Sequence, residues 1–239
     1  MKVLITGSNG FVGKNLKSAL MEHGEIEIFS YDLSTDKELL GEYCKICDFV
    51  FHLAGINRTE NVDEYYSGNY GFTKKLTDCL LACGNTCPIL YTSSIHAVYD
   101  NPYGRSKKAC EELLAEYEKV CKVNTYIYRL PNLFGKWCRP NYNSVIATFC
   151  HNISNGLPIY ISNPDTRINF AYIDDVVEEF ISALKGKGYK GIDGFFSIPV
   201  VHSVSLGQIA ELLYSFKDGY IPSDLDSFES KLYTTFLSY

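Results

Sequence analysis

Val3-Leu4-Ile5-Thr6-Gly7-Ser8-Asn9-Gly10-Phe11-Val12-Gly13 is the stretch that decides the fold. Its first three residues form an apolar run that predicts a buried strand. Apolar side chains at helical spacing follow, at Phe11, Val12, Leu16, Ala19 and Leu20. The three glycines between them supply backbone conformations with positive φ and let a phosphate approach the first amides of the helix. The stretch therefore predicts a strand, a tight turn and a helix.

A second apolar run, residues 26–32, ends in Asp32 about twenty residues after the glycine turn. A carboxylate at that place accepts hydrogen bonds from the ribose hydroxyls of a dinucleotide. The two features together predict a dinucleotide site. We expect its contacts to come from Gly7, Asn9, Gly10, Phe11, Val12, Gly13 and Asp32.

Bulk composition excludes several classes of function. The net charge is −6 and no segment gathers lysine and arginine, so the electrostatic footprint of a nucleic-acid-binding protein is missing. No run of eighteen apolar residues or basic leader is present, which predicts a cytoplasmic chain without membrane insertion. The cysteine count, 9, is odd, and Cys44-x-x-Cys47 has no second half, so we expect reduced thiols and no metal site.

Strands and helices alternate through the first part of the chain. The expected strands are residues 3–5, 26–32, 48–53, 88–92 and 125–129, and the expected helices include residues 73–83 and 104–120. Such alternation predicts an α/β fold, a Rossmann-type doubly wound parallel sheet whose ligands lie at the carboxyl ends of the strands. We expect residues 1–135 to form the dinucleotide-binding part.

The later part is less regular, and we expect residues 136–239 to form a smaller substrate-binding lobe of the same unit. The expected elements there are helices at residues 144–155, 176–184 and 205–216 and short strands at residues 159–161, 170–173 and 195–198. Ser205 and Gln208 have the spacing of a helix capping box.

Tyr103 and Lys107 stand four residues apart at the start of an expected helix, hence on one face. A phenol is a poor acid–base catalyst near neutral pH unless a nearby cation shifts its pKa, and Lys107 can supply that cation. Ser94 lies at the carboxyl end of the preceding strand, where it can hold a substrate oxygen. These three residues are the expected catalytic group, with Ser93 as the fallback for Ser94.

The order of these motifs resembles the extended short-chain dehydrogenase/reductase superfamily of sugar-nucleotide epimerases, dehydratases and reductases. The likeness covers nearly the whole chain and includes His52-Leu53-Ala54-Gly55, Asn69, residues 129–135 and residues 172–176. It implies that Ser94 and Tyr103 bond the reacting sugar oxygen and that Lys107 also holds the nicotinamide ribose. Further coenzyme contacts are expected from Leu53, Ala54, Gly55, Asn69, Ser93, Tyr103 and Lys107.

For the substrate, the same resemblance implies a nucleotide-sugar contact from Asn132. Lys136, Arg139 and Arg167 are the expected contacts to the diphosphate, and His96 is a further substrate candidate. Relatives often carry an arginine four residues before the position of Tyr172, where this chain has Ile168. The superfamily also suggests a homodimer whose face includes the Tyr103 helix.

Residues 101–107, 131–150 and 232–239 resemble the reductases of capsular polysaccharide synthesis, which carry a carboxy-terminal cupin domain. This likeness implies an NADPH-dependent oxidoreductase that reduces the 4-keto group of a UDP-linked 2-acetamido-2,6-dideoxy sugar. Asp32 would repel a 2′-phosphate, so both NADPH and NADH stay open. The chain ends where the cupin domain would begin, so it is either a fragment or a stand-alone reductase.

Two other functions stay open at this point. One is a nucleotide-sugar 4-epimerase that retains NAD, since it would use the same three residues, and the other is a non-catalytic nucleotide-binding protein on the same fold. Dehydratases of the superfamily follow the strand-end residue with Asp-Glu, whereas Ile95 and His96 stand here. Dehydration is therefore not expected.

Overall fold

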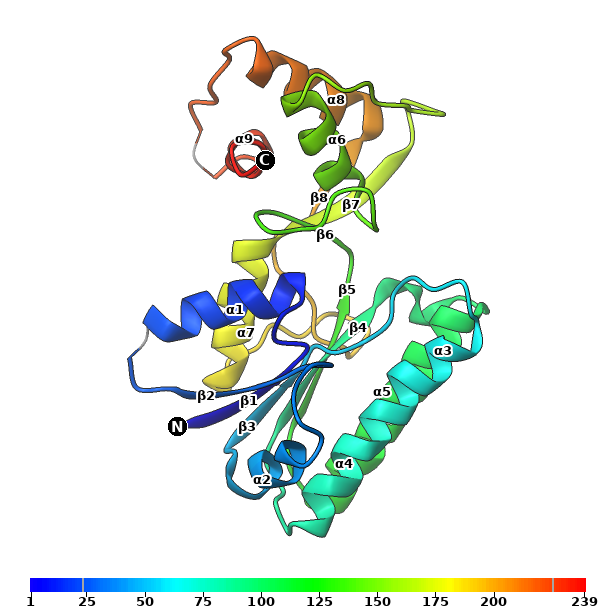
Figure 1. The fold of residues 1–239 in the computed structure, drawn as a ribbon, viewed down its shortest axis with the longest axis vertical. Coiled ribbons are helices and arrows are strands. Elements are labelled where there is room, and N and C mark those ends of the chain that lie inside the picture. Colours follow the sequence, from blue (N-terminus) through cyan, green and yellow to red (C-terminus); the bar gives the residue numbers. More distant parts are fainter. Residues whose placement is uncertain (23, 225) are drawn as a thin grey trace. The chain divides into compact units, whose positions relative to one another are not determined.

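The computed structural model describes residues 1–22, 24–224 and 226–239, which form two compact units. The first unit comprises Met1–Leu130 and Val177–Ser197, and the second comprises Pro131–Val176 and Ile198–Tyr239. Figure 1 shows the elements of both.

The first unit is built on a five-stranded parallel sheet with the order β2-β1-β3-β4-β5. Its strands are β1 (Lys2–Thr6), β2 (Glu27–Tyr31), β3 (Phe49–His52), β4 (Ile89–Ser94) and β5 (Thr125–Leu130). Val3 is in register with Ile28 on one side and with Phe49 on the other. The carboxyl ends of the strands therefore meet at one edge, and the expected Rossmann-type α/β fold is confirmed.

Helices cover both faces of this sheet (Figure 1). They are α1 (Phe11–Glu22), α2 (Leu39–Ile46), α3 (Asp63–Tyr65), α4 (Phe72–Ala82) and α5 (Pro102–Cys121), with a π-helical turn η1 (Tyr66–Gly71) before α4 and a 3₁₀ turn η2 (Ile95–Val98) after β4. Helices α2, α4 and α5 cover one face, with α4 and α5 side by side, and α1 lies on the other. This arrangement places the starts of α1 and α5 at the carboxyl edge of the sheet.

Alternation along the buried strands divides the core between the two faces. Val50 packs with Leu76 and Leu114 of the helices α4 and α5. Phe51, the next residue, points to the other face and contacts Phe180, a residue of α7 (Ile173–Leu184). Because both faces are covered, the strands are apolar throughout rather than alternating with polar residues.

The second unit has a three-stranded sheet with the order β6-β7-β8. Its strands are β6 (Asn132–Phe134), β7 (Arg167–Tyr172) and β8 (His202–Ser205), and its helices are α6 (Val145–Ser154), α8 (Leu206–Lys217) and α9 (Phe228–Phe236). Phe134 is fully buried and contacts Phe170, Tyr172 and Phe228. The expected capping box of Ser205 and Gln208 is confirmed at the start of α8.

The division into units differs from the expected boundary at residue 135 because residues 177–197 belong with the first unit. Tyr128 of β5 explains the difference. Its hydroxyl donates a 2.6 Å hydrogen bond to Glu179, and its backbone forms a parallel bridge with Phe196. A segment far along the chain thus completes the edge of the first sheet, which local periodicity cannot reveal.

Two of the expected strands were wrong. Residues 159–161 form no strand, and residues 195–198 contribute only the bridge at Phe196. Short apolar runs of this kind acquire strand structure only where a neighbouring strand offers a free edge. Strand β8 and helix α9 were not expected from the sequence.

Within the described residues, no helix combines the length and the apolar character that a membrane crossing requires. The same part of the chain holds no group of three or more His, Cys, Asp or Glu side chains arranged to bind a metal. All nine cysteines are free thiols, and Cys44, Cys47 and Cys87 are buried in the core beneath α2.

Candidate active site

In the glycine turn after β1, Gly7 and Gly13 have no room for a side chain. Gly7 has a φ of 71°, and a side chain there would lie 2.7 Å from the backbone nitrogen of Ala54. Gly10 and Gly13 have no positive φ, so the expectation of a positive φ was wrong for these two glycines. A side chain on Gly13 would collide with the carbonyl oxygen of Gly7 and the backbone of Ser8. Gly13 therefore has to be a glycine because the start of α1 packs directly on the turn.

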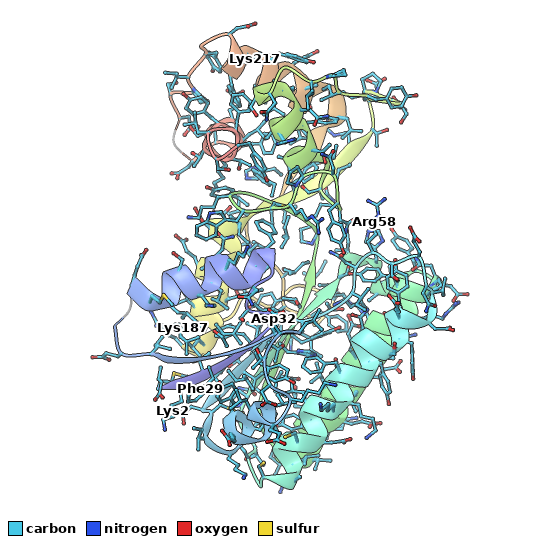
Figure 2. All side chains as sticks on the ribbon, viewed as in Figure 1. Lys2, Phe29, Asp32, Arg58, Lys187 and Lys217 are labelled. Carbon is cyan, nitrogen blue, oxygen red and sulfur yellow. The ribbon has the colours of Figure 1, made fainter. Side chains whose placement is uncertain are left out.

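Asp32 directly follows β2 and lies beside the glycine turn (Figure 2). Its Oδ2 accepts a 2.7 Å hydrogen bond from the backbone N–H of Asn9, and its Oδ1 accepts one of 2.9 Å from the backbone N–H of Leu33. The carboxylate therefore fixes the turn in addition to presenting negative charge at the edge of the sheet.

The features of this edge fit a dinucleotide. The turn has no side chain at Gly7 and Gly13, helix α1 begins directly after it, and a carboxylate stands at the end of the neighbouring strand. The positions of the expected residues Gly7, Asn9, Gly10, Phe11, Val12, Gly13 and Asp32 agree with this use.

Beside this cradle, the loop after β3 is held by Asn69. The Asn69 side chain accepts a 2.7 Å hydrogen bond from the backbone N–H of Ile56 and donates to the Ile56 carbonyl at 3.0 Å and to Ser106 Oγ at 2.9 Å. A side chain on Gly55 would lie 2.9 Å from Asn69 and 3.3 Å from the Lys107 ammonium. Asn69 thus shapes the loop of Leu53, Ala54 and Gly55, and its polar atoms already have protein partners.

Ser94, Tyr103 and Lys107 are brought together by the turn that follows β4. Asn101 caps helix α5 by accepting a 2.8 Å hydrogen bond from the backbone N–H of Gly104. Gly104 lies so close to the carbonyl oxygens of His96 and Tyr99 that no side chain would fit. This close packing brings Tyr103 to Ser94, with which it forms a hydrogen bond.

Lys107 is fully enclosed one turn further along α5. Its Nζ donates a 2.8 Å hydrogen bond to the carbonyl oxygen of Thr92 and lies 4.8 Å from the centre of the Tyr91 ring and 6.0 Å from that of Tyr103. Burial lowers the pKa of Lys107 to about 8. The ammonium is therefore still the major form at neutral pH.

The pKa of Tyr103 differs from the expectation that Lys107 lowers it. Burial raises this pKa above its ordinary value, and the hydrogen bond with Ser94 opposes the rise. Tyr103 is therefore a neutral phenol at neutral pH. Its ring meets Tyr65 edge-on at 5.6 Å and His96 at 6.2 Å between ring centres.

Ser93 and Ser94 have different partners, as expected for neighbouring residues of a strand. Ser94 Oγ accepts a 3.1 Å hydrogen bond from the backbone N–H of His96. Ser93 is buried, and its hydroxyl donates a 2.5 Å hydrogen bond to Glu111. Between the two serines, only Ser94 contacts Tyr103.

His52, at the end of β3, is a structural residue. Its ring nitrogens lie 2.8 Å from the hydroxyls of Thr6 and Thr73. Burial, together with the charge of Lys107, lowers the pKa of His52 to about 3, so the ring is neutral. His52 is thus packed within the core.

Of the expected substrate contacts, His96 lies in the first unit, whereas Asn132, Lys136, Arg139 and Arg167 lie in the second. Asn132 is exposed on β6. Lys136 Nζ lies 3.5 Å from the Asp174 carboxylate, the Arg139 guanidinium faces the ring of Tyr142, and Arg167 donates a 2.5 Å hydrogen bond to the carbonyl oxygen of Ser203. Each of these cations therefore already has a neighbour within its own unit.

Sequence reasoning missed Glu111 and Arg129. Glu111 is buried on α5 one turn after Lys107, and Arg129 of β5 donates to both of its carboxylate oxygens, at 3.0 and 2.7 Å. A usable signal was present, because a charged residue on the apolar face of an amphipathic helix requires a buried partner.

Comparisons with known proteins give concordant findings. The sequence profile of the NAD dependent epimerase/dehydratase family matches residues 3–192. The chain is 45% identical, over 218 residues, to a Pseudomonas aeruginosa protein named UDP-2-acetamido-2,6-beta-L-arabino-hexul-4-ose reductase. The aligned residues make up 91% of this chain and 58% of that protein. The chain thus spans only a little over half the length of this relative.

Among solved structures, the capsular polysaccharide assembling protein CapF from Staphylococcus aureus superposes with a TM-score of 0.90 and 42% identity, covering 100% of this chain and 65% of that one. The UDP-glucuronic acid 4-epimerase from Bacillus cereus, solved with NAD, has a TM-score of 0.81 and 18% identity, covering 100% and 96%. The second likeness shows the fold alone. The expected similarity to capsular polysaccharide reductases is confirmed by the first.

Proposed function

Because this chain belongs to the NAD dependent epimerase/dehydratase family, we propose that it reduces the 4-keto group of a UDP-linked 2-acetamido-2,6-dideoxy-hexose in surface polysaccharide synthesis. The observation that carries the proposal is a neutral Tyr103, hydrogen-bonded to Ser94, above the buried ammonium of Lys107. The 45% identity to a reductase of this type supports the substrate class.

The protein residues have distinct roles in the proposed reaction. A nicotinamide coenzyme, when bound, supplies the hydride. Ser94 donates a hydrogen bond to the ketone oxygen, and Tyr103 gives its phenolic proton to that oxygen as negative charge develops on it. Because burial keeps the phenol protonated, it is ready to act as an acid, which suits reduction. The Lys107 ammonium then stabilises the phenolate that remains.

We propose NADH as the preferred reductant, held by the glycine turn, Asp32 and the loop of Leu53, Ala54 and Gly55, with Asn69 supporting this loop. Ser93 supports the site indirectly, because its hydroxyl is bonded to Glu111. The Asp32 carboxylate suits ribose hydroxyls and repels a 2′-phosphate. Lys136, Arg139 and Arg167 are proposed contacts for the nucleotide diphosphate, and Asn132 and His96 are proposed further contacts for the nucleotide-sugar. The proposal includes a homodimer in the cytoplasm whose interface contains α5.

A coenzyme oxidation assay tests this proposal. UDP-4-keto-6-deoxy sugars made by a 4,6-dehydratase are offered with NADH or NADPH, and the loss of absorbance at the nicotinamide wavelength is followed. We expect turnover that requires added coenzyme, with kcat/KM for NADH at least roughly 10-fold above that for NADPH. Turnover of a UDP-sugar without added coenzyme would instead indicate an epimerase.

Tyr103→Phe and Tyr99→Phe form a matched pair for the acid. Tyr99 lies in the same turn, is 57% exposed and has no part in the proposed chemistry. We expect Tyr103→Phe to lower kcat by roughly 10²–10⁴-fold, as loss of a general acid does, and Tyr99→Phe to retain the parent rate. Equal rates for Tyr103→Phe and the parent would exclude Tyr103 as the proton donor.

A further inference from the structure

The end of strand β4 is bonded to helix α5 at three successive residues. The pairs are Thr92 with Lys107, Ser93 with Glu111, and Ser94 with Tyr103. The α5 partners are spaced four residues apart, so they form one stripe along the helix. Two of the three bonds involve the proposed catalytic residues themselves, and the third, between Ser93 and Glu111, does not.

Glu111 is the buried anchor of that third bond. Its side chain is 5% exposed, which is an unfavourable environment for a carboxylate unless it is paired. Arg129 supplies the pairing with two hydrogen bonds, and Arg129 is the residue directly across from Ser93 in the β4–β5 ladder. The guanidinium in turn stacks on the Phe195 ring at 3.5 Å.

This geometry fixes the strand end in place. The Glu111 carboxylate bonds a residue of β4 and a residue of β5 at the same level of the sheet, so it joins both strands to α5. A shift of α5 along the strand would break three bonds to one carboxylate at once. Because Ser94 directly follows Ser93 in β4, the bonds to Glu111 also fix the position of Ser94 relative to Tyr103.

We propose that Glu111, clamped by Arg129, is a positioning residue for the reaction: through Ser93 it holds Ser94 in reach of Tyr103 and holds Lys107 in place. The proposal rests on the proposed function for its catalytic consequence. Its structural part, the coupling of Glu111 to Lys107, can be measured separately.

Electrostatics support the coupling. The titratable groups around Lys107 are His52 of β3, Tyr91 of β4, and Tyr103, Cys110 and Glu111 of α5. Burial lowers the pKa of Lys107, and the charges of Cys110 and Glu111 oppose that effect. Removing the Glu111 carboxylate therefore removes one of the two effects that help the lysine to keep its proton.

The test compares Ser93→Ala, Glu111→Gln and Glu111→Asp with Glu118→Gln as the matched control. Glu118 lies on the same helix and also bonds a buried strand residue, Thr125, but about three turns away from Lys107. Steady-state kinetics and coenzyme affinity are measured across pH, and the Lys107 resonance is titrated by NMR in protein labelled with ¹³C at the lysine ε-carbon.

We expect Ser93→Ala to lower kcat roughly 10-fold while coenzyme affinity changes by less than about 2-fold, because small misplacements of reacting groups cost rate more than binding. Glu111→Gln should move the Lys107 titration and the alkaline limb of kcat to lower pH. Glu111→Asp, which keeps the carboxylate, should return the alkaline limb of the kcat profile to the pH at which the parent shows it. Glu118→Gln should match the parent in all of these.

The proposal is overturned if Ser93→Ala keeps the parent kcat, or if Glu111→Gln titrates Lys107 as Glu118→Gln does. Should Glu111→Gln fail to fold, Ser93→Ala decides the question, since it removes one hydroxyl and leaves the buried ion pair intact. If the parent protein does not reduce the keto-sugar, the proposed function fails, and the lysine titration alone decides whether Glu111 acts on Lys107.

Discussion

Lys107, a proposed catalytic residue, is buried at a cost in stability. Its ammonium is enclosed, and the polar atom that receives its hydrogen bond is the carbonyl oxygen of Thr92. Burial lowers its pKa from the ordinary 10.5 to about 8. A base whose pKa is lower in the folded state binds protons more weakly there than when unfolded, so the folded protein carries an energetic cost at neutral pH.

Replacing Lys107 with methionine should therefore stabilise the protein at pH 7 while abolishing reduction. The expected gain in the free energy of unfolding is on the order of 1–3 kcal/mol. Between about pH 8 and 10.5 the lysine of the folded parent loses its proton while that of the unfolded chain still holds it. The cost of burying the ammonium therefore disappears over this range, and the gap between the two proteins closes. Urea denaturation of both proteins at pH 7 and pH 10.5 measures the gap.

The matched control is Lys108→Met, at the next position of α5, where the side chain is exposed. It should leave stability nearly unchanged at either pH, because an exposed ammonium keeps its hydration when the chain folds. A Lys107→Met protein that is less stable than the parent at pH 7, or a gap that stays constant with pH, would contradict the account.

At the scale of elements, the helices and strands that could be predicted from the sequence are those that a local residue pattern determines. The strand, turn and helix at the amino terminus, the helix of Tyr103 and Lys107, and the apolar strands all carry their signals within a few residues. The start of α5 was expected at residue 104, yet Asn101 caps it and Pro102 occupies its first turn. That signal was also local, since Asn followed by Pro is typical of a helix start.

What could not be predicted depends on partners far away in the chain. Phe196 completes the edge of the first sheet through Tyr128, and Glu111 is bound by Arg129, 18 positions away. The distinction between Ser93 and Ser94 likewise required the positions of Glu111 and Tyr103. Pairings of this kind depend on how distant segments pack together, so they cannot be predicted from the local pattern of a single sequence.

The glycine turn provides a prediction at this scale. Gly13→Ala should push α1 away from the turn, because the new Cβ would lie 2.8 Å from the Cα of Ser8 and collide with the Gly7 carbonyl oxygen. We expect a loss of about 1–3 kcal/mol in the free energy of unfolding and at least roughly 10-fold weaker coenzyme binding. Urea denaturation and titration of coenzyme fluorescence measure these two effects.

Gly41→Ala is the control for Gly13→Ala. Gly41 lies inside α2, and a Cβ there would meet nothing within 4 Å. Alanine should stabilise that helix by about 0.5–1 kcal/mol and leave coenzyme binding unchanged. If Gly13→Ala behaved in the same way as Gly41→Ala, the glycine would be dispensable and the proposed coenzyme cradle would lose its main structural argument.

At the scale of the whole molecule, the proposed coenzyme contacts are confined to one of the two units. The glycine turn, Asp32, the loop after β3 and Lys107 all belong to Met1–Leu130. A ligand that binds only the folded state stabilises the structure that holds it, by about 2.7 kcal/mol at a concentration 100 times its Kd. The stabilisation should therefore be unequally distributed along the chain.

Hydrogen exchange with and without NADH tests this distribution. We expect the largest gain in protection at the backbone amides of residues 7–13 and 53–56, a smaller gain along α5, and little change in α8 and α9 of the second unit. NADPH at the same concentration should protect less, because of Asp32. Protection that is uniform over both units, or stronger with NADPH, would show that the coenzyme is not bound as the glycine turn and Asp32 indicate.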